Sequence, residues 1–209
     1  MADRVRDQDF AAFLAEQHRG LYRTHIGPFN RMVNELRTDD EWMPHVSPSY
    51  AGTQARMLTL FQDPGPKTQD GAGSGMLCIE NRDPSAERQH RLLELAGIPV
   101  SDIIAWNAYP WYINSKPTSA QLSRGLPVLN RVVELCPNLQ VVMLHGGVAQ
   151  DAWRKYRNLY PSTARRLHII ETFHTSNRAL IGTEKERQAR LENLGRAYAE
   201  AASVLYGRS

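Results

Sequence analysis

The sequence predicts an α/β fold: a single domain with a central four-stranded, mainly parallel sheet and helices on both of its faces. Four short apolar runs stop at turn residues, which is typical of buried strands; they lie at 56–61, 102–108, 139–144 and 167–172. Stretches with helical spacing separate these runs, and strands that alternate with helices form parallel sheets covered on both faces. The length of 209 residues, with 42% hydrophobic residues, suits one domain over 1–209 with a substantial core.

The helix between the first two strands has the best-defined ends. Asp83 stands at its N-cap position, Pro84 opens its first turn and Gly97 follows its last residue, so we expect it to span 84–96. The spacing of apolar residues predicts the other helices, at 7–22, 29–36, 118–135, 148–159 and 184–205. Two prolines predict an ordered loop over 42–50.

The composition argues against several classes of protein. The N-terminal residues are charged and no apolar run approaches a membrane span, so we expect a cytoplasmic protein with no membrane segment. Cys78 and Cys136 are too few for a zinc or iron–sulfur site, and they indicate reduced thiols. Residues 151–209 hold 11 Lys and Arg against 6 Asp and Glu, whereas 1–150 hold 14 against 16. The basic last part of the chain allows a phosphate-backbone partner.

Polar residues and glycines stand at the ends of all four predicted strands. Asp63 follows the first strand, Asn107 lies at the end of the second, Gly146 and Gly147 follow the third, and His174 follows the fourth. The carboxyl ends of parallel strands meet at one edge of the sheet, where α/β proteins bind ligands, so we expect these groups to line one cleft. Each residue alone also fits a structural role, as a turn, strand-end or capping residue.

Together these groups are suited to removing a base from a sugar–phosphate chain. A carboxylate at Asp63 can orient water or stabilise a developing cation, and His174 can donate a hydrogen bond to a developing oxyanion. The carboxamide of Asn107 has a donor beside an acceptor, which matches one edge of a nucleobase. The glycines open a helix whose N–H groups form an anion site, and the Ser176 hydroxyl can bind phosphate.

The order of these motifs resembles the uracil-DNA glycosylase superfamily, most closely its family 1 enzymes. FQDPGP at 61–66 is similar to their GQDPYH motif, and GMLC at 75–78 is similar to a GL-x-F segment. Asn107 ends an apolar strand, as their uracil-reading Asn does. LHGGVAQ at 144–150 is similar to LLWGSHAQ, and HTSN at 174–177 to HPSP.

The resemblance, which spans residues 56–180, implies an enzyme that flips uracil out of DNA and hydrolyses its N-glycosidic bond. Asp63 would orient the attacking water, and His174 would stabilise charge on the O2 atom of the departing base. The base would be bound by Gln62, Gly65, Cys78 and Asn107, and DNA by Gly146, Gly147, Ser176 and Arg178. The resemblance implies no metal and no organic cofactor. We expect a monomer that acts on uracil in single- or double-stranded DNA.

The base-binding positions depart from the family 1 pattern. Gly65 replaces a Tyr that excludes the thymine methyl group, which opens the pocket beside C5 of the base. Cys78 replaces a Phe that stacks on uracil, a contact worth roughly 1–3 kcal/mol per base. Tyr109 and Trp111 are candidates to take over this stacking.

The motif after the fourth strand also departs, and two other functions stay open. Thr175 and Asn177 replace two prolines, which predicts a less rigid loop, and Arg178 stands where a Leu would enter the duplex. A binder of damaged or abasic DNA with low turnover would have the same fold and fit these changes. A Ser-His-Asp hydrolase built on Ser176, His174 and Asp63 is disfavoured, because no G-x-S-x-G turn precedes a helix.

Overall fold

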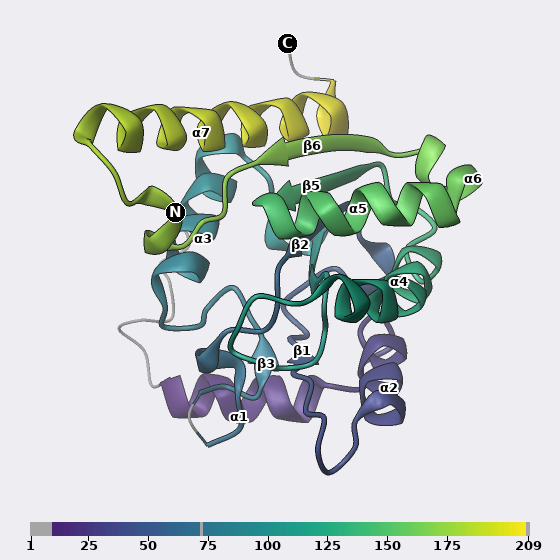
Figure 1. Ribbon diagram of the computed structural model, residues 1–209. Coiled ribbons are helices and arrows are strands. Elements are labelled where there is room, and N and C mark those ends of the chain that lie inside the picture. The colour runs from purple at the N-terminus through teal and green to yellow at the C-terminus, as the bar shows by residue number, and fades with distance from the viewer. Residues whose placement is uncertain (1–9, 72, 208–209) are drawn as a thin grey trace.

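The four expected strands form one sheet. The computed structural model describes residues 10–71 and 73–207. The strands are β2 (Met57–Phe61), β4 (Ile103–Asn107), β5 (Val141–His145) and β6 (His168–Thr172). They lie in the order β4-β2-β5-β6, and every pair is parallel (Figure 1). The predicted α/β fold is therefore confirmed, with a sheet that is parallel throughout rather than mainly.

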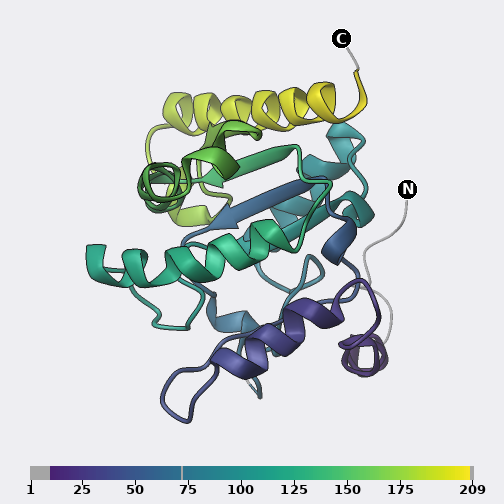
Figure 2. The same ribbon diagram turned by 90° about the vertical axis from the view of Figure 1, so that its right-hand side faces the viewer.

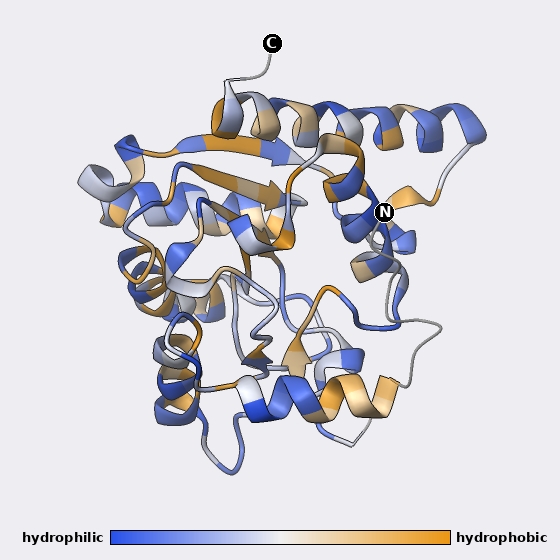
Figure 3. Cartoon of the chain, turned by 180° about the vertical axis from the view of Figure 1, so that it is seen from behind, coloured by the Kyte–Doolittle hydropathy of each residue, from blue (hydrophilic) through white to orange (hydrophobic). Residues whose placement is uncertain are grey.

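Helices cover both faces of the sheet. The helices in the described residues are α1 (Phe10–Gly20), α2 (Gly27–Leu36), α3 (Pro84–Ala96), α4 (Ser119–Glu134), α5 (Gly147–Leu159), α6 (Pro161–Arg165) and α7 (Glu184–Tyr206). α7 packs with α3 on one face, and α4 lies with α5 on the other (Figure 2). The outer side of α7 is mostly hydrophilic, whereas β5 is hydrophobic (Figure 3). None of the helices in the described part of the chain has the length and apolar character needed to cross a membrane.

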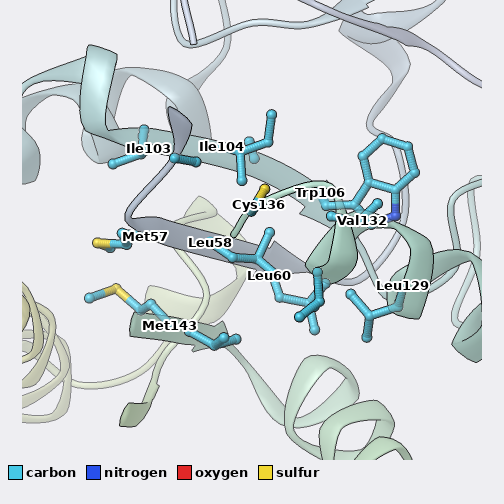
Figure 4. Close-up of a cluster of buried hydrophobic side chains, with 14 of the residues drawn as sticks. Met57, Leu58, Leu60, Ile103, Ile104, Trp106, Leu129, Val132, Cys136 and Met143 are labelled. Carbon is cyan, nitrogen blue, oxygen red and sulfur yellow. The ribbon is translucent and has the colours of Figure 1, made fainter. Parts of the chain in front are cut away.

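The side chains of β2 alternate between the two helical layers. Leu58 and Leu60 are fully buried on the side of α4, where Leu129 lies in the same cluster (Figure 4). Thr59 points to the other layer, where its Oγ1 accepts a hydrogen bond from Nε2 of Gln89 on α3 at 3.1 Å. Alternate side chains of a strand point to opposite faces, so the next residue on the Thr59 side is the last one of β2, Phe61.

The register of the sheet aligns the strand ends. Phe61 lies opposite Asn107 on β4, and Leu60 lies opposite Leu144 on β5. His145 in turn lies opposite Thr172, the last residue of β6. The loops that follow all four strands therefore leave the sheet at one edge.

Short elements account for the differences from the sequence prediction. β1 (His45–Val46) and β3 (Met76–Leu77) pair in parallel as a separate sheet, although β1 lies within the loop predicted over 42–50. Two residues are too few to show an alternating pattern. The helix predicted over 7–22 corresponds to α1, which ends at Gly20; residues 7–9 lie outside the described part.

Candidate active site

One cavity lies at the edge of the sheet where the strands end. Its volume is about 310 Å³, and Asp63, Asn107 and His174 all contribute to its wall. This volume falls within the range of pockets that hold small ligands. The structure therefore brings together the three residues on which the functional hypothesis depends, from the ends of β2, β4 and β6.

Asp63 is held at the cavity by its neighbour. Gln62 donates a hydrogen bond from Nε2 to Oδ1 of Asp63 at 2.8 Å, and the same nitrogen lies 3.4 Å from the carbonyl oxygen of Ser115. Burial raises the pKa of Asp63, and the hydrogen bond from Gln62 opposes that rise. Gln62 is not one of the residues that line the cavity, where the resemblance implied that it binds the base; its side chain instead orients the Asp63 carboxylate.

The turn after Asp63 leaves open space at Gly65. Gly65 lines the cavity, and a Cβ atom at this position would meet no atom within 4 Å. Its φ of −77° is accessible to any residue, so the backbone does not require glycine here. The carbonyl oxygen of Gly65 accepts hydrogen bonds from Thr68, from N–H at 3.0 Å and from Oγ1 at 2.7 Å. Glycine at this position therefore enlarges the cavity, although the turn itself does not require a glycine.

His174 is a neutral hydrogen-bond donor. Its Nδ1 accepts a hydrogen bond from the N–H of Ser176 at 3.0 Å, so the neutral ring carries its proton on Nε2. Burial lowers the pKa of His174 to about 4. At neutral pH the ring can therefore donate from Nε2 without carrying a charge.

Phe61 contributes an aromatic ring to the cavity wall. Its ring stacks on His145 with centroids 4.4 Å apart and planes 3° apart, and it meets His174 edge to face at 5.4 Å. His145 is fully buried: its Nδ1 lies 3.3 Å from the carbonyl oxygen of Phe173, and its Nε2 lies 3.3 Å from the hydroxyl of Tyr198. Burial lowers the pKa of His145 to about 3, so this histidine supports Phe61 as a neutral ring.

Asn107 presents an unsatisfied acceptor. The residue is buried and lines the cavity, and its Oδ1 has no hydrogen-bond partner within the described residues. A buried polar atom without a partner is costly, on the order of 1–3 kcal/mol. A ligand that carries an N–H group would satisfy this oxygen on binding.

The candidate stacking residues lie elsewhere than expected. Tyr109 and Trp111 are buried outside the cavity wall, and the indole N–H of Trp111 donates to the carbonyl oxygen of Leu36 at 3.2 Å. Cys78 lines the cavity but is buried, which raises the pKa of its thiol to about 11. Besides His174, the aromatic residues of the wall are Tyr50 and Phe61.

The expected phosphate contacts are only partly available. The N–H of Gly146 donates to the carbonyl oxygen of Thr172 at 2.8 Å, so the prediction that this group faces an anion is wrong. Gly146 instead has φ of 84°, and a Cβ atom there would lie 3.3 Å from Cβ of His174. Gly147 begins α5 with open space around it, and Arg178 is exposed. Ser176 caps a short 3₁₀-helix, its Oγ accepting from the N–H of Ala179 at 3.4 Å.

Sequence reasoning missed part of the wall and its support. The wall residues it missed include Tyr50, Phe61, Lys67 and Gln89. Arg88 of α3 also escaped notice, and it donates hydrogen bonds to the loop that carries His174. In sequence these residues look like ordinary helix, turn or strand positions, so no local signal marks them. Within residues 10–71 and 73–207, no group of three or more His, Cys, Asp or Glu side chains is arranged to hold a metal ion.

Comparison with known proteins identifies the family. The family model of the uracil DNA glycosylase superfamily matches residues 48–195, which is more than half of the chain and includes every residue singled out above in the candidate cavity. No curated protein matches the chain. The chain therefore belongs to the uracil DNA glycosylase superfamily, whose members are glycosylases that act on DNA.

Proposed function

We propose that this protein is a monofunctional uracil-DNA glycosylase that hydrolyses the N-glycosidic bond of a flipped uracil and leaves an abasic site. The observation that carries the proposal is the joint presence of Asp63, Asn107 and His174 in one cavity wall. These residues supply a carboxylate, a base-reading amide and a neutral donor, which are the groups that the reaction needs.

The reaction divides between the two sides of the cavity. The Asp63 carboxylate orients a water molecule toward C1′ of the sugar and stabilises positive charge on the sugar as the C1′–N1 bond breaks. The bonding electrons leave with the base, and His174 stabilises the resulting anion by donating from Nε2 to O2. The water oxygen then bonds to C1′, its proton passes to Asp63, and the base takes a proton from solvent after release.

Asn107 and Phe61 together account for base binding. Oδ1 of Asn107, which lacks a partner, accepts from N3–H of uracil, while its amide N–H donates to O4. Cytosine presents the reversed pattern and is rejected, because it leaves buried polar atoms unpaired. The Phe61 ring, backed by His145, offers the stacking surface that Cys78 lacks.

DNA contacts complete the proposal. Arg178 and Ser176 lie on the loop after His174, and the N-terminus of α5 at Gly147 presents N–H groups without intrahelical partners. We propose that these groups bind phosphates on either side of the flipped nucleotide, with the protein acting as a monomer.

A cleavage assay separates this function from its alternative. An oligonucleotide with a single uracil is incubated with the protein and treated with alkali, and an abasic oligonucleotide is tested by gel shift in parallel. Strand breaks at the uracil support the glycosylase. Tight binding to abasic DNA without strand breaks would instead favour the low-turnover binder. The observation behind this alternative is that Cys78 stands where family 1 enzymes have a stacking Phe.

A further inference from the structure

The loop that carries His174 is held by a side chain from another helix. Residues 173–177 contain no proline, yet His174 must keep a fixed orientation to donate toward the cavity. Arg88, on α3, reaches this loop with its side chain. Its Nη1 donates to the carbonyl oxygen of Thr175, and its Nη2 donates to Oδ1 of Asn177 at 2.9 Å.

The two bonds lie on either side of the residue that orients His174. Thr175 precedes Ser176 and Asn177 follows it, and the N–H of Ser176 donates to Nδ1 of His174. Fixing both neighbours fixes the direction of that N–H, and thereby keeps the histidine proton on Nε2. The planar guanidinium suits this task, because its donors have a fixed geometry that an ammonium group lacks.

α3 carries Arg88 and also borders the cavity. Three residues at its N-terminal end, Pro84, Ser85 and Ala86, line the same cavity. A second arginine, Arg190 of α7, donates to the carbonyl oxygens of Ala179 at 3.0 Å and Ile181 at 2.7 Å. The far end of the segment is therefore braced separately, and Arg88 supplies the side-chain hydrogen bonds from another helix to Thr175 and Asn177, next to His174.

We propose that Arg88 is a positioning residue for base excision, which holds the loop of residues 174–177 so that His174 donates from Nε2 into the cavity. The inference rests on the proposed function for its effect on rate, but its effect on the histidine does not depend on that function. Arg88 acts through His174 and its loop. It is therefore distinct from an arginine that binds a DNA phosphate.

The main variant is Arg88→Lys, which keeps the positive charge and removes the planar fork. The single-turnover excision rate on a uracil oligonucleotide should fall about 10- to 100-fold, since a displacement of about 1 Å can cost 10²-fold. The Kd for an oligonucleotide with uncleavable 2′-fluoro-deoxyuridine should change by less than about twofold. A loss of affinity with an unchanged rate would overturn the proposal, because Arg88 would then be a DNA contact.

Two further variants test the mechanism. Arg91→Lys, at an exposed position of the same helix, is the matched control and should keep the wild-type rate. Asn177→Ala removes one acceptor and should slow excision less than Arg88→Lys. The double variant should be little slower than Arg88→Lys alone, because both changes break one network. Fully additive losses would argue against a shared network.

A spectroscopic measurement separates failure of this inference from failure of the proposed function. ¹⁵N NMR of the imidazole nitrogens reports which ring nitrogen of His174 carries the proton. The wild type and Arg91→Lys should show the Nε2-protonated form, and Arg88→Lys should show a mixture of tautomers. An unchanged His174 spectrum in Arg88→Lys would overturn the positioning role even if uracil is excised. A wild type that leaves uracil intact would overturn the proposed function and leave the NMR result to decide on Arg88.

Discussion

Two loops at the same edge of the sheet carry Asp63 and His174, and they are held in different ways. The loop after β2, residues 62–68, is stiffened from within: Pro64 and Pro66 restrict their own backbone angles, and Thr68 closes the turn. The loop after β6, residues 173–177, has no proline, and its internal restraint is the hydrogen bond from the N–H of Ser176 to Nδ1 of His174.

The second loop takes its support from distant elements. Arg88 of α3 binds it through Thr175 and Asn177, and the edge of the His174 ring rests against Phe61 of β2. A loop stiffened by its own residues can be recognised as a motif, whereas a loop braced from another helix cannot. The comparison shows that a functional group can be held by residues far away in the chain, so that its loop does not look rigid in sequence.

The strongest test of the first loop is Asp63→Asn. This change keeps the side-chain shape and removes the charge that faces the sugar, so the excision rate should fall on the order of 10²-fold or more. Single-turnover kinetics on a uracil oligonucleotide measure the change, and Asp40→Asn, at an exposed site, serves as control. Wild-type rates in Asp63→Asn would show that this loop carries no catalytic group.

Two histidines, His174 of the second loop and His145 at the end of β5, should make the protein sensitive to acid. His174 and His145 have pKa values lowered to about 4 and about 3 by burial, against about 6.5 in an unfolded chain. Below about pH 6.5 the unfolded state therefore binds more protons, and stability falls as pH falls toward the folded values. Each histidine should therefore lower the free energy of unfolding by about 2 kcal/mol at pH 5 relative to pH 7.

Urea unfolding at pH 7 and pH 5 measures this loss. His174→Gln should lose less stability between the two pH values than the wild type, because it removes one of the two groups. The raised pKa of Asp63 acts in the opposite sense, since a carboxyl that protonates more readily in the folded state favours folding as pH falls. An equal loss in wild type and His174→Gln would mean that His174 is not enclosed as described.

The open space at Gly65 predicts a change in specificity. A Tyr side chain fits the backbone there and would occupy the volume beside the base, so Gly65→Tyr should suppress excision of 5-substituted uracils about 10-fold relative to uracil. Gly65→Ala should have a smaller effect in the same direction. Single-turnover rates on both substrates give the ratio, and a constant ratio would show that Gly65 does not face C5.

Phe61 precedes the first loop, and its ring contacts His174 of the second loop. Of the four changes, its replacement should have the smallest effect. Phe61→Leu keeps an apolar side chain but removes the ring, so binding of an uncleavable 2′-fluoro-deoxyuridine oligonucleotide should weaken about fivefold, at the lower end of stacking energies. Affinity for an abasic oligonucleotide should stay the same, because it has no base to stack. Equal losses on both ligands would place the effect in the loops and not in base stacking.

The strands and the meeting of the main residues could be predicted from sequence, because they follow from local patterns. Asp63, Asn107 and His174 each stand where an apolar run ends, and in a parallel sheet these strand ends meet at one edge. Gly146 was misjudged because its N–H extends the pairing of β5 with β6, which only the register of the sheet reveals.

Other parts of the site depend on contacts between segments that are far apart in the chain. Phe61 reads as the last residue of a buried strand, and only the stacked ring of His145 and the cavity give it a second role. Arg88 reads as a charged residue on a helix surface. Its partners lie more than 80 residues later, where no spacing rule connects them.

The strand order also separates the parts of the site that open easily from the part that stays folded. Within the described chain β2 is paired on both sides, with β4 and β5, whereas β4 and β6 are each paired on one side and form the two edges of the sheet. Regions with fewer neighbours open locally at lower free energy than the core. Amide hydrogens of β6 should therefore exchange faster than those of β2. Molecules with β6 detached would keep Asp63 on a folded core while lacking His174, so on warming, catalytic competence should disappear before the protein unfolds.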